Sequence, residues 1–189
     1  MKTWIKSLIV VIIILILISI PMISRYNNLV NLDQNVNVAE SNIDTQLQRR
    51  SDLIPNLVNT VKGYASQEKD IFTKIADARS KLAGATNITD QANADSELSS
   101  ALSRLLLVVE NYPDLKSNQN FQDLSIQLEG TENRIAIARQ DYNTAVTTYN
   151  KEIKSFPTKI IASLFGFQEK PFYKATEGAQ QVPEVNFTS

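Results

Sequence analysis

Apolar side chains recur at every third or fourth position through most of this chain, and that spacing restricts it to helices packed along one face. One series covers residues 29–47, a second covers residues 54–82, a third covers residues 98–112 and the longest covers residues 124–156. Only five glycines and six prolines interrupt the 189 residues, which favours long helices over strands. We therefore predict an all-α fold, an up-and-down four-helix bundle of long helices behind one N-terminal transmembrane helix.

The N-terminal segment has the composition of a membrane span. Residues 8–18 are an unbroken run of Leu, Ile and Val. A helix over residues 4–23 would be about 30 Å long, which matches the hydrocarbon core of a bilayer. We predict that residues 1–23 form a single anchor in the cell membrane. A cleaved signal peptide is the weaker alternative, because no small-x-small cleavage site follows the run.

The charges beside this segment predict its orientation. Lys2 and Lys6 precede the apolar run, whereas Arg25 alone follows it closely. Lysine and arginine are enriched in the cytoplasmic flanks of membrane spans. We therefore expect a cytoplasmic N-terminus and an extracytoplasmic domain.

The heptapeptide RRSDLIP at residues 49–55 separates the first two apolar series. Arg49 and Arg50 suit a helix C-terminus, where cations meet the negative end of the helix dipole. Ser51 or Asp52 suits an N-cap, and Pro55 is tolerated in a first helical turn. We therefore predict a tight connection between two helices here; one long helix kinked at Pro55 is the alternative.

The remaining boundaries follow from the same start and stop signals. The first two helices are expected over residues 24–50 and 52–83, a third ends near residue 111 before a proline, and a fourth ends at Phe156 before another. These helices would form a domain of residues 24–156. Residues 157–189 would form an aromatic C-terminal tail, packed on the bundle or near the membrane.

The chain contains no cysteine and no histidine. It therefore lacks disulfides, thiolate nucleophiles, and the commonest general base and metal ligand. Ser66 and Lys69 match the S-x-x-K pattern of serine acyl enzymes, but the companion motifs are missing. Glu68 has no histidine partner for a di-iron site. With a net charge of −1, no nucleic-acid-binding surface is expected. We predict no enzymatic activity, no metal and no cofactor.

Several blocks are specific enough to compare with a known family, among them residues 46–69, residues 110–116 (ENYPDLK) and residues 128–135 (LEGTENRI). In these blocks the chain resembles the LemA family. The resemblance implies a helical domain behind one membrane span, with no established molecular activity. Family genes often lie near those for membrane zinc metalloproteases, which implies such a protease as a candidate partner.

The predicted topology also predicts a binding surface. If the first helix leaves the membrane, the connection at residues 49–55 and the loop at residues 112–118 meet at a distal tip. Loops on a rigid scaffold commonly carry function. We therefore expect a membrane-protein partner to bind this tip, through Arg49, Arg50, Asp52, Asn56, Glu110, Asp114 and Lys116. The predicted function is a membrane-anchored interaction or scaffold protein. The alternatives are a peripheral lipid-sensing domain and an accessory factor to a membrane metalloprotease.

Two further expectations follow from the same helical pattern. Glu68 lies in an apolar series, and we expect it to pair with Arg134 or to bond Thr131, because an unpaired buried carboxylate is costly. The apolar side chains of the tail are expected near the membrane, where they either cap the bundle or contact the lipid interface; they are Phe156, Ile160, Ile161, Leu164, Phe165, Phe167 and Phe172.

Overall fold

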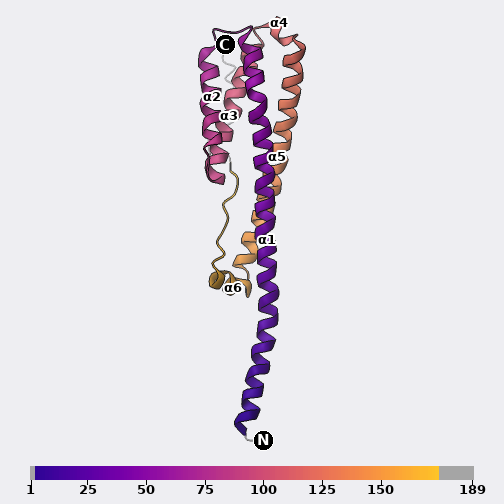
Figure 1. Ribbon diagram of the computed structural model, residues 1–189, viewed down its shortest axis with the longest axis vertical. Helices are drawn as coiled ribbons and strands as arrows, with labels where there is room; N and C mark the ends of the chain where they lie inside the picture. The colour runs from indigo at the N-terminus through magenta and orange to yellow at the C-terminus, as the bar shows by residue number, and fades with distance from the viewer. Residues whose placement is uncertain (1–2, 175–189) are drawn as a thin grey trace, which may run out of the picture. The chain divides into compact units, whose positions relative to one another are not determined.

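The computed structural model describes the backbone of residues 3–174 and the side chains of these residues other than 3, 5–7, 11 and 14–18. All regular secondary structure in this part of the chain is helical (Figure 1), which confirms the all-α class. The helices are α1 (Thr3–Lys62), α2 (Lys69–Ala83), α3 (Ile88–Val109), α4 (Pro113–Lys116), α5 (Gln119–Lys154) and α6 (Thr158–Phe165).

The chain divides into two compact units, and α1 and α5 contribute to both. The first unit comprises residues 1–39 and 141–170, and the second comprises residues 40–140 and 171–189. In the second unit, apolar side chains of α1 to α5 form one core, in which α2 and α3 lie side by side (Figure 1). This core includes Ile54, Leu57, Val61, Phe72, Ile75, Leu98, Leu105, Leu115, Phe121 and Leu128.

The predicted helix boundary at residues 49–55 is wrong, because α1 continues without a break to Lys62. The buried side chains around this point keep a spacing of four, three, four, three and four residues; they are Ile43, Leu47, Arg50, Ile54, Leu57 and Val61. Arg50 thus occupies a core position between the two apolar series and joins them into one stripe. Asp52 does not cap a helix, and its carboxylate instead accepts a hydrogen bond of 2.7 Å from Gln48, one turn earlier.

The first turn of the described chain lies at residues 63–68, where Gly63 follows the last residue of α1. Glu68 belongs to this turn and precedes α2, so it is not part of a helix face as predicted. Its carboxylate accepts a hydrogen bond of 3.3 Å from the Tyr112 hydroxyl. The predicted partners are wrong: Arg134 is exposed, and the Thr131 hydroxyl donates to the Gln127 carbonyl at 2.8 Å within α5.

The buried side chains of the first unit come from α1, α5 and α6, and they include Leu29, Val36, Tyr142, Val146, Tyr149, Ile153 and Ile161. The tail, predicted to be irregular after an aromatic stretch, begins with α6, which ends at Gly166 in the left-handed conformation (φ 77°). Asn150 then holds the following extended segment. Its amide donates to the Lys170 carbonyl and accepts from the Lys170 backbone N–H, both at 2.9 Å.

Among the described residues, no helix is long and apolar enough to cross a bilayer. The predicted anchor of residues 1–23 falls partly outside the described residues, at residues 1 and 2 and at several side chains between residues 3 and 18. It therefore stays a prediction.

The continuity of α1 can be tested at Pro55, which lies inside the helix and removes one backbone donor. We expect Pro55→Ala to raise the free energy of unfolding by about 2 kcal/mol. This value is the helix-interior cost of proline, about 3 kcal/mol relative to alanine, less up to about 1 kcal/mol that proline contributes by restricting the unfolded chain. Urea unfolding in detergent solution measures the difference.

The matched control is Pro113→Ala, because Pro113 is the first residue of α4, a position where a missing N–H costs nothing. This control is expected to show no gain in stability. Equal effects of the two substitutions, or a loss of stability for Pro55→Ala, would contradict a continuous α1.

Candidate functional site

A buried charge network lies in the second unit, centred on the fully buried carboxylate of Asp95 in α3. Arg50 of α1 and Arg139 of α5 each form an ion pair with one Asp95 oxygen. The hydroxyl of Tyr173, in the segment after α6, donates a hydrogen bond of 2.8 Å to Asp95 Oδ2. Three helices and the C-terminal segment therefore meet at one carboxylate.

The outer part of the network balances the charge of the centre. Arg50 Nη1 forms an ion pair with Glu132 of α5 and donates a hydrogen bond of 3.0 Å to Ser99 Oγ of α3. Two guanidinium groups thus face two carboxylates, so Asp95 and Arg50 are buried without a net charge. Such an arrangement is favourable only when the pairing is complete, because each buried charge loses its hydration.

Tyr173 is buried beside Asp95 at the centre of the network. Burial raises the pKa of its hydroxyl to about 12, although the neighbouring Arg139 opposes the shift. The Arg139 guanidinium also lies 5.2 Å from the centroid of the Tyr173 ring, within the range of a cation–π contact. The centre of the network, Asp95 and Arg50, is thus buried, whereas Arg139 and Glu132 reach its partly exposed edge, and Arg50 presents no surface to a partner. Its place among the predicted partner-binding residues was wrong for this reason.

A second set of contacts joins two turns of the second unit, residues 63–68 and residues 110–118, which we call the turn junction. The Tyr112 hydroxyl accepts a hydrogen bond of 2.9 Å from Gln67 and donates to Glu68. Asn118 donates a bond of 3.1 Å to the Tyr64 hydroxyl, and its side-chain oxygen accepts from the Phe121 backbone N–H at the start of α5.

The turn junction contains three of the seven predicted partner-binding residues. Glu110 and Lys116 form an exposed ion pair of 2.5 Å, and Asp114 is exposed between them in the chain. The other exposed candidates, Arg49, Asp52 and Asn56, lie on the outer face of α1 at a spacing of three and four residues. A meeting of two turns was therefore predicted, but with the wrong partner for residues 112–118.

A comparison with protein families gives a match that covers the region of both sites. The model of the LemA family matches residues 39–187. The chain belongs to the LemA family. The matched region contains both the buried charge network and the turn junction, and it confirms the resemblance found in the sequence blocks.

Three curated proteins are similar to most of this chain. Magnetosome protein MamQ 2 of Paramagnetospirillum magneticum is 29% identical over 179 residues, which cover 81% of this chain and 66% of the relative. Magnetosome protein MamQ of Magnetospirillum gryphiswaldense is 26% identical over 178 residues, which cover 80% and 65%. Protein LemA of Metamycoplasma hominis is 26% identical over 156 residues, which cover 82% and 71%. The chain thus spans slightly less than two thirds of the length of the MamQ proteins.

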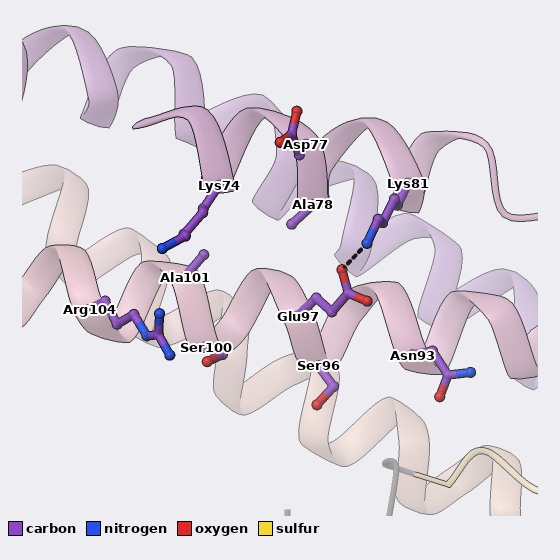
Figure 2. A pocket seen from close by; sticks show the side chains of 10 residues that line it. All are labelled: Lys74, Asp77, Ala78, Lys81, Asn93, Ser96, Glu97, Ser100, Ala101 and Arg104. Atoms are coloured by element: carbon purple, nitrogen blue, oxygen red, sulfur yellow. Dashed lines mark hydrogen bonds and ion pairs between the residues drawn. The ribbon is translucent and has the colours of Figure 1, made fainter. Parts of the chain in front are cut away.

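A surface groove of about 650 Å³ between α2 and α3 is a further candidate site in this LemA-family chain. Figure 2 shows Ala78 and Ala101 between charged and polar side chains of both helices, with Lys81 bonded to Glu97 across the groove at 2.6 Å. The hydrogen bond that the Lys81 ammonium donates to the Glu97 carboxylate raises the pKa of Lys81. Sequence reasoning missed this groove, because its charges come together only when α2 packs against α3. Since cations and anions alternate along it, the groove favours no one class of ligand.

The buried network predicts a sharp difference between two acidic residues of α3. Asp95→Asn leaves two arginines without their shared counter-ion, and removal of one partner from a buried ion pair typically costs about 3–5 kcal/mol. Glu97 is the matched control, because it is two residues away and ion-paired, but exposed. We expect Asp95→Asn to lower the melting temperature strongly and Glu97→Gln to change it little, since exposed pairs contribute little. Similar shifts for the two variants would contradict the network.

The raised pKa of Tyr173 predicts that the free energy of unfolding falls at high pH. The unfolded chain releases a tyrosine proton near pH 10, whereas folded Tyr173 keeps its proton until about pH 12. Between these two pH values the unfolded state binds fewer protons than the folded state. The contribution of Tyr173 to the free energy of unfolding is therefore fully present below pH 10 and is lost as the pH rises to about 12. We expect Tyr173→Phe to lower the free energy of unfolding by about 1–3 kcal/mol at pH 7, because Asp95 loses a donor.

The same Tyr173→Phe variant should also lose stability less steeply than the parent between pH 10 and pH 12. Urea unfolding at a series of pH values measures both effects. Tyr64→Phe is the control, because Tyr64 is exposed and lies in the same unit. Parallel pH profiles for the parent and Tyr173→Phe would overturn the assignment of the raised pKa to Tyr173.

Proposed function

We propose that this LemA-family chain is a membrane-anchored interaction protein without a catalytic role of its own. In this proposal residues 4–23 span the cell membrane, the N-terminus is cytoplasmic and the helical domain, an up-and-down bundle of α1, α2, α3 and α5, is extracytoplasmic. The turn junction binds a membrane-protein partner. A membrane zinc metalloprotease is the candidate that the family resemblance implies.

The observation that carries this proposal is the preorganised turn junction. Side-chain hydrogen bonds from Gln67, Tyr112 and Asn118 already fix the two turns against each other. A partner that binds there would therefore meet little cost in ordering the loops. Glu110, Asp114 and Lys116 stay exposed on this fixed support, as expected of binding residues placed on loops of a rigid scaffold.

The buried charge network is a second observation that supports this proposal. Arg50, Asp95 and Arg139 tie α1, α3 and α5 together within the unit that carries the turn junction. Asp95 and Arg50, at the centre of this network, are buried and paired with each other, while Glu132 and Arg139 at its edge are partly exposed. Their arrangement suits a support for a binding surface better than a reaction centre, which needs access for a substrate.

The test reverses one ion pair at the turn junction. In the double variant Glu110→Lys with Lys116→Glu, the pair can re-form with exchanged signs, so the fold is kept while the charge pattern facing a partner changes. The control is Asp70→Lys with Lys74→Glu, a pair on α2 that is also exposed and has the same 2.5 Å separation. Both variants are expected to keep the parental melting temperature.

Partner recovery is measured by affinity capture from detergent-solubilised membranes. We expect recovery to fall about tenfold for the turn-junction variant, equivalent to about 1.4 kcal/mol of binding free energy, and to stay at the parental level for the α2 control. Equal recovery by all three proteins would remove the turn junction from the proposed function.

A further inference from the structure

Helix α6 has two apolar faces, and only one of them is covered. Thr158, Ile161 and Ala162 are buried in the first unit. On the opposite side, Ile160 is 57% exposed and Leu164, one turn later, is 69% exposed. A soluble surface normally keeps such clustered apolar groups few, and an exposed apolar patch marks a site of contact.

Exposed aromatic side chains also lie at the two ends of α6. Phe156 precedes α6 by two residues and is 85% exposed, and Phe165 at its end is 57% exposed. Lys159 lies beside this face and is also exposed. An apolar helix face with a flanking cation is typical of segments that lie in the plane of a membrane interface.

The helix is firmly held despite its exposed face. The Thr158 hydroxyl donates a hydrogen bond of 2.9 Å to Glu152 near the end of α5. At the other end of α6, the Phe165 ring lies 4.8 Å from the ring of Tyr26 in α1, and the Phe167 ring lies 5.8 Å from it, measured between centroids. The exposed face is therefore presented by a docked helix, within one compact unit.

The contact with Tyr26 places α6 at a defined level of α1. Tyr26 follows Ile23, the last residue of the proposed span, by three residues in the same continuous helix. Three residues correspond to a rise of about 4.5 Å along the helix axis, whereas the headgroup region of a bilayer adds roughly 5–8 Å on each side of the hydrocarbon core. If residues 4–23 span the membrane, α6 lies within the headgroup layer where the span emerges.

We propose that α6 and Phe156 form a second membrane contact, in which the exposed face enters the lipid interface beside the point where α1 leaves the bilayer. This inference rests on the proposed anchor, and it names the lipid bilayer as the partner of this face. Ile160, Leu164 and Phe156 enter the boundary between headgroups and acyl chains, while Lys159 stays at the level of the phosphates. The burial of these side chains in lipid accounts for their exposure in the protein.

The test uses fluorescence quenching by lipids that carry a spin label near the headgroup. In the full chain, Trp4, which is the single tryptophan, is changed to phenylalanine, and a reporter is introduced as Ile160→Trp or, in a second variant, Leu164→Trp. The matched control is Ile126→Trp, because Ile126 is 66% exposed on α5 in the other unit. All proteins are reconstituted into phosphatidylcholine–phosphatidylglycerol vesicles, and flotation after an alkaline wash reports the anchor separately.

We expect all variants to float and the two α6 reporters to be quenched at least threefold more strongly than the Ile126→Trp control. Flotation with equal quenching at α6 and at residue 126 overturns the α6 contact and leaves the anchor standing. Loss of flotation overturns the anchor and the α6 contact together. A blue-shifted α6 reporter that lipid labels do not quench means that a protein surface covers the face, and this result also rejects the lipid contact.

Discussion

The buried carboxylate of Asp95 is the point on which the arrangement of the second unit depends. Apolar side chains in neighbouring helices can exchange partners at modest cost when one helix slides by a turn, because dispersion contacts are not directional. A carboxylate between Arg50 and Arg139 has no such freedom, since any shift leaves a charge without hydration or partner. The network therefore sets the register of α1, α3 and α5, while the surrounding core supplies most of the apolar burial.

The apolar spacing of the sequence predicted the all-α class and most of the buried positions, from Leu29 in α1 to Ile153 in α5. It failed at Arg50, because an arginine between two apolar series resembles a helix end. The spacing from Leu47 to Ile54 has room for a core residue at position 50, and this was the available signal. What the sequence could not supply was the counter-ion, since Asp95 and Glu132 lie far along the chain.

The candidate site could also be predicted only in part from the sequence. The loop before α5 was placed correctly by Pro113, but its partner turn was assigned to residues 49–55 instead of residues 63–68. Pro55 does not end the helix as predicted, because a helix with a well-buried apolar stripe can accommodate a proline. The contacts that join the two turns are made by Tyr112, Gln67 and Asn118, whose roles depend on side-chain geometry that no local pattern encodes.

The clamp that Asn150 makes on the C-terminal segment determines which substitutions this chain can accept at positions 150 and 170. Its amide bonds the backbone N–H and C=O of residue 170, much as a neighbouring strand would, so the hold is indifferent to most side chains at that position. The lysine present adds only a partly exposed ion pair with Asp33. Proline alone would abolish the N–H donor, whereas at position 150 even aspartate would set a charge against a carbonyl oxygen. The C-terminal segment is thus held at residue 170 by an asparagine twenty positions earlier, and the side chain at position 170 can vary without loosening this hold.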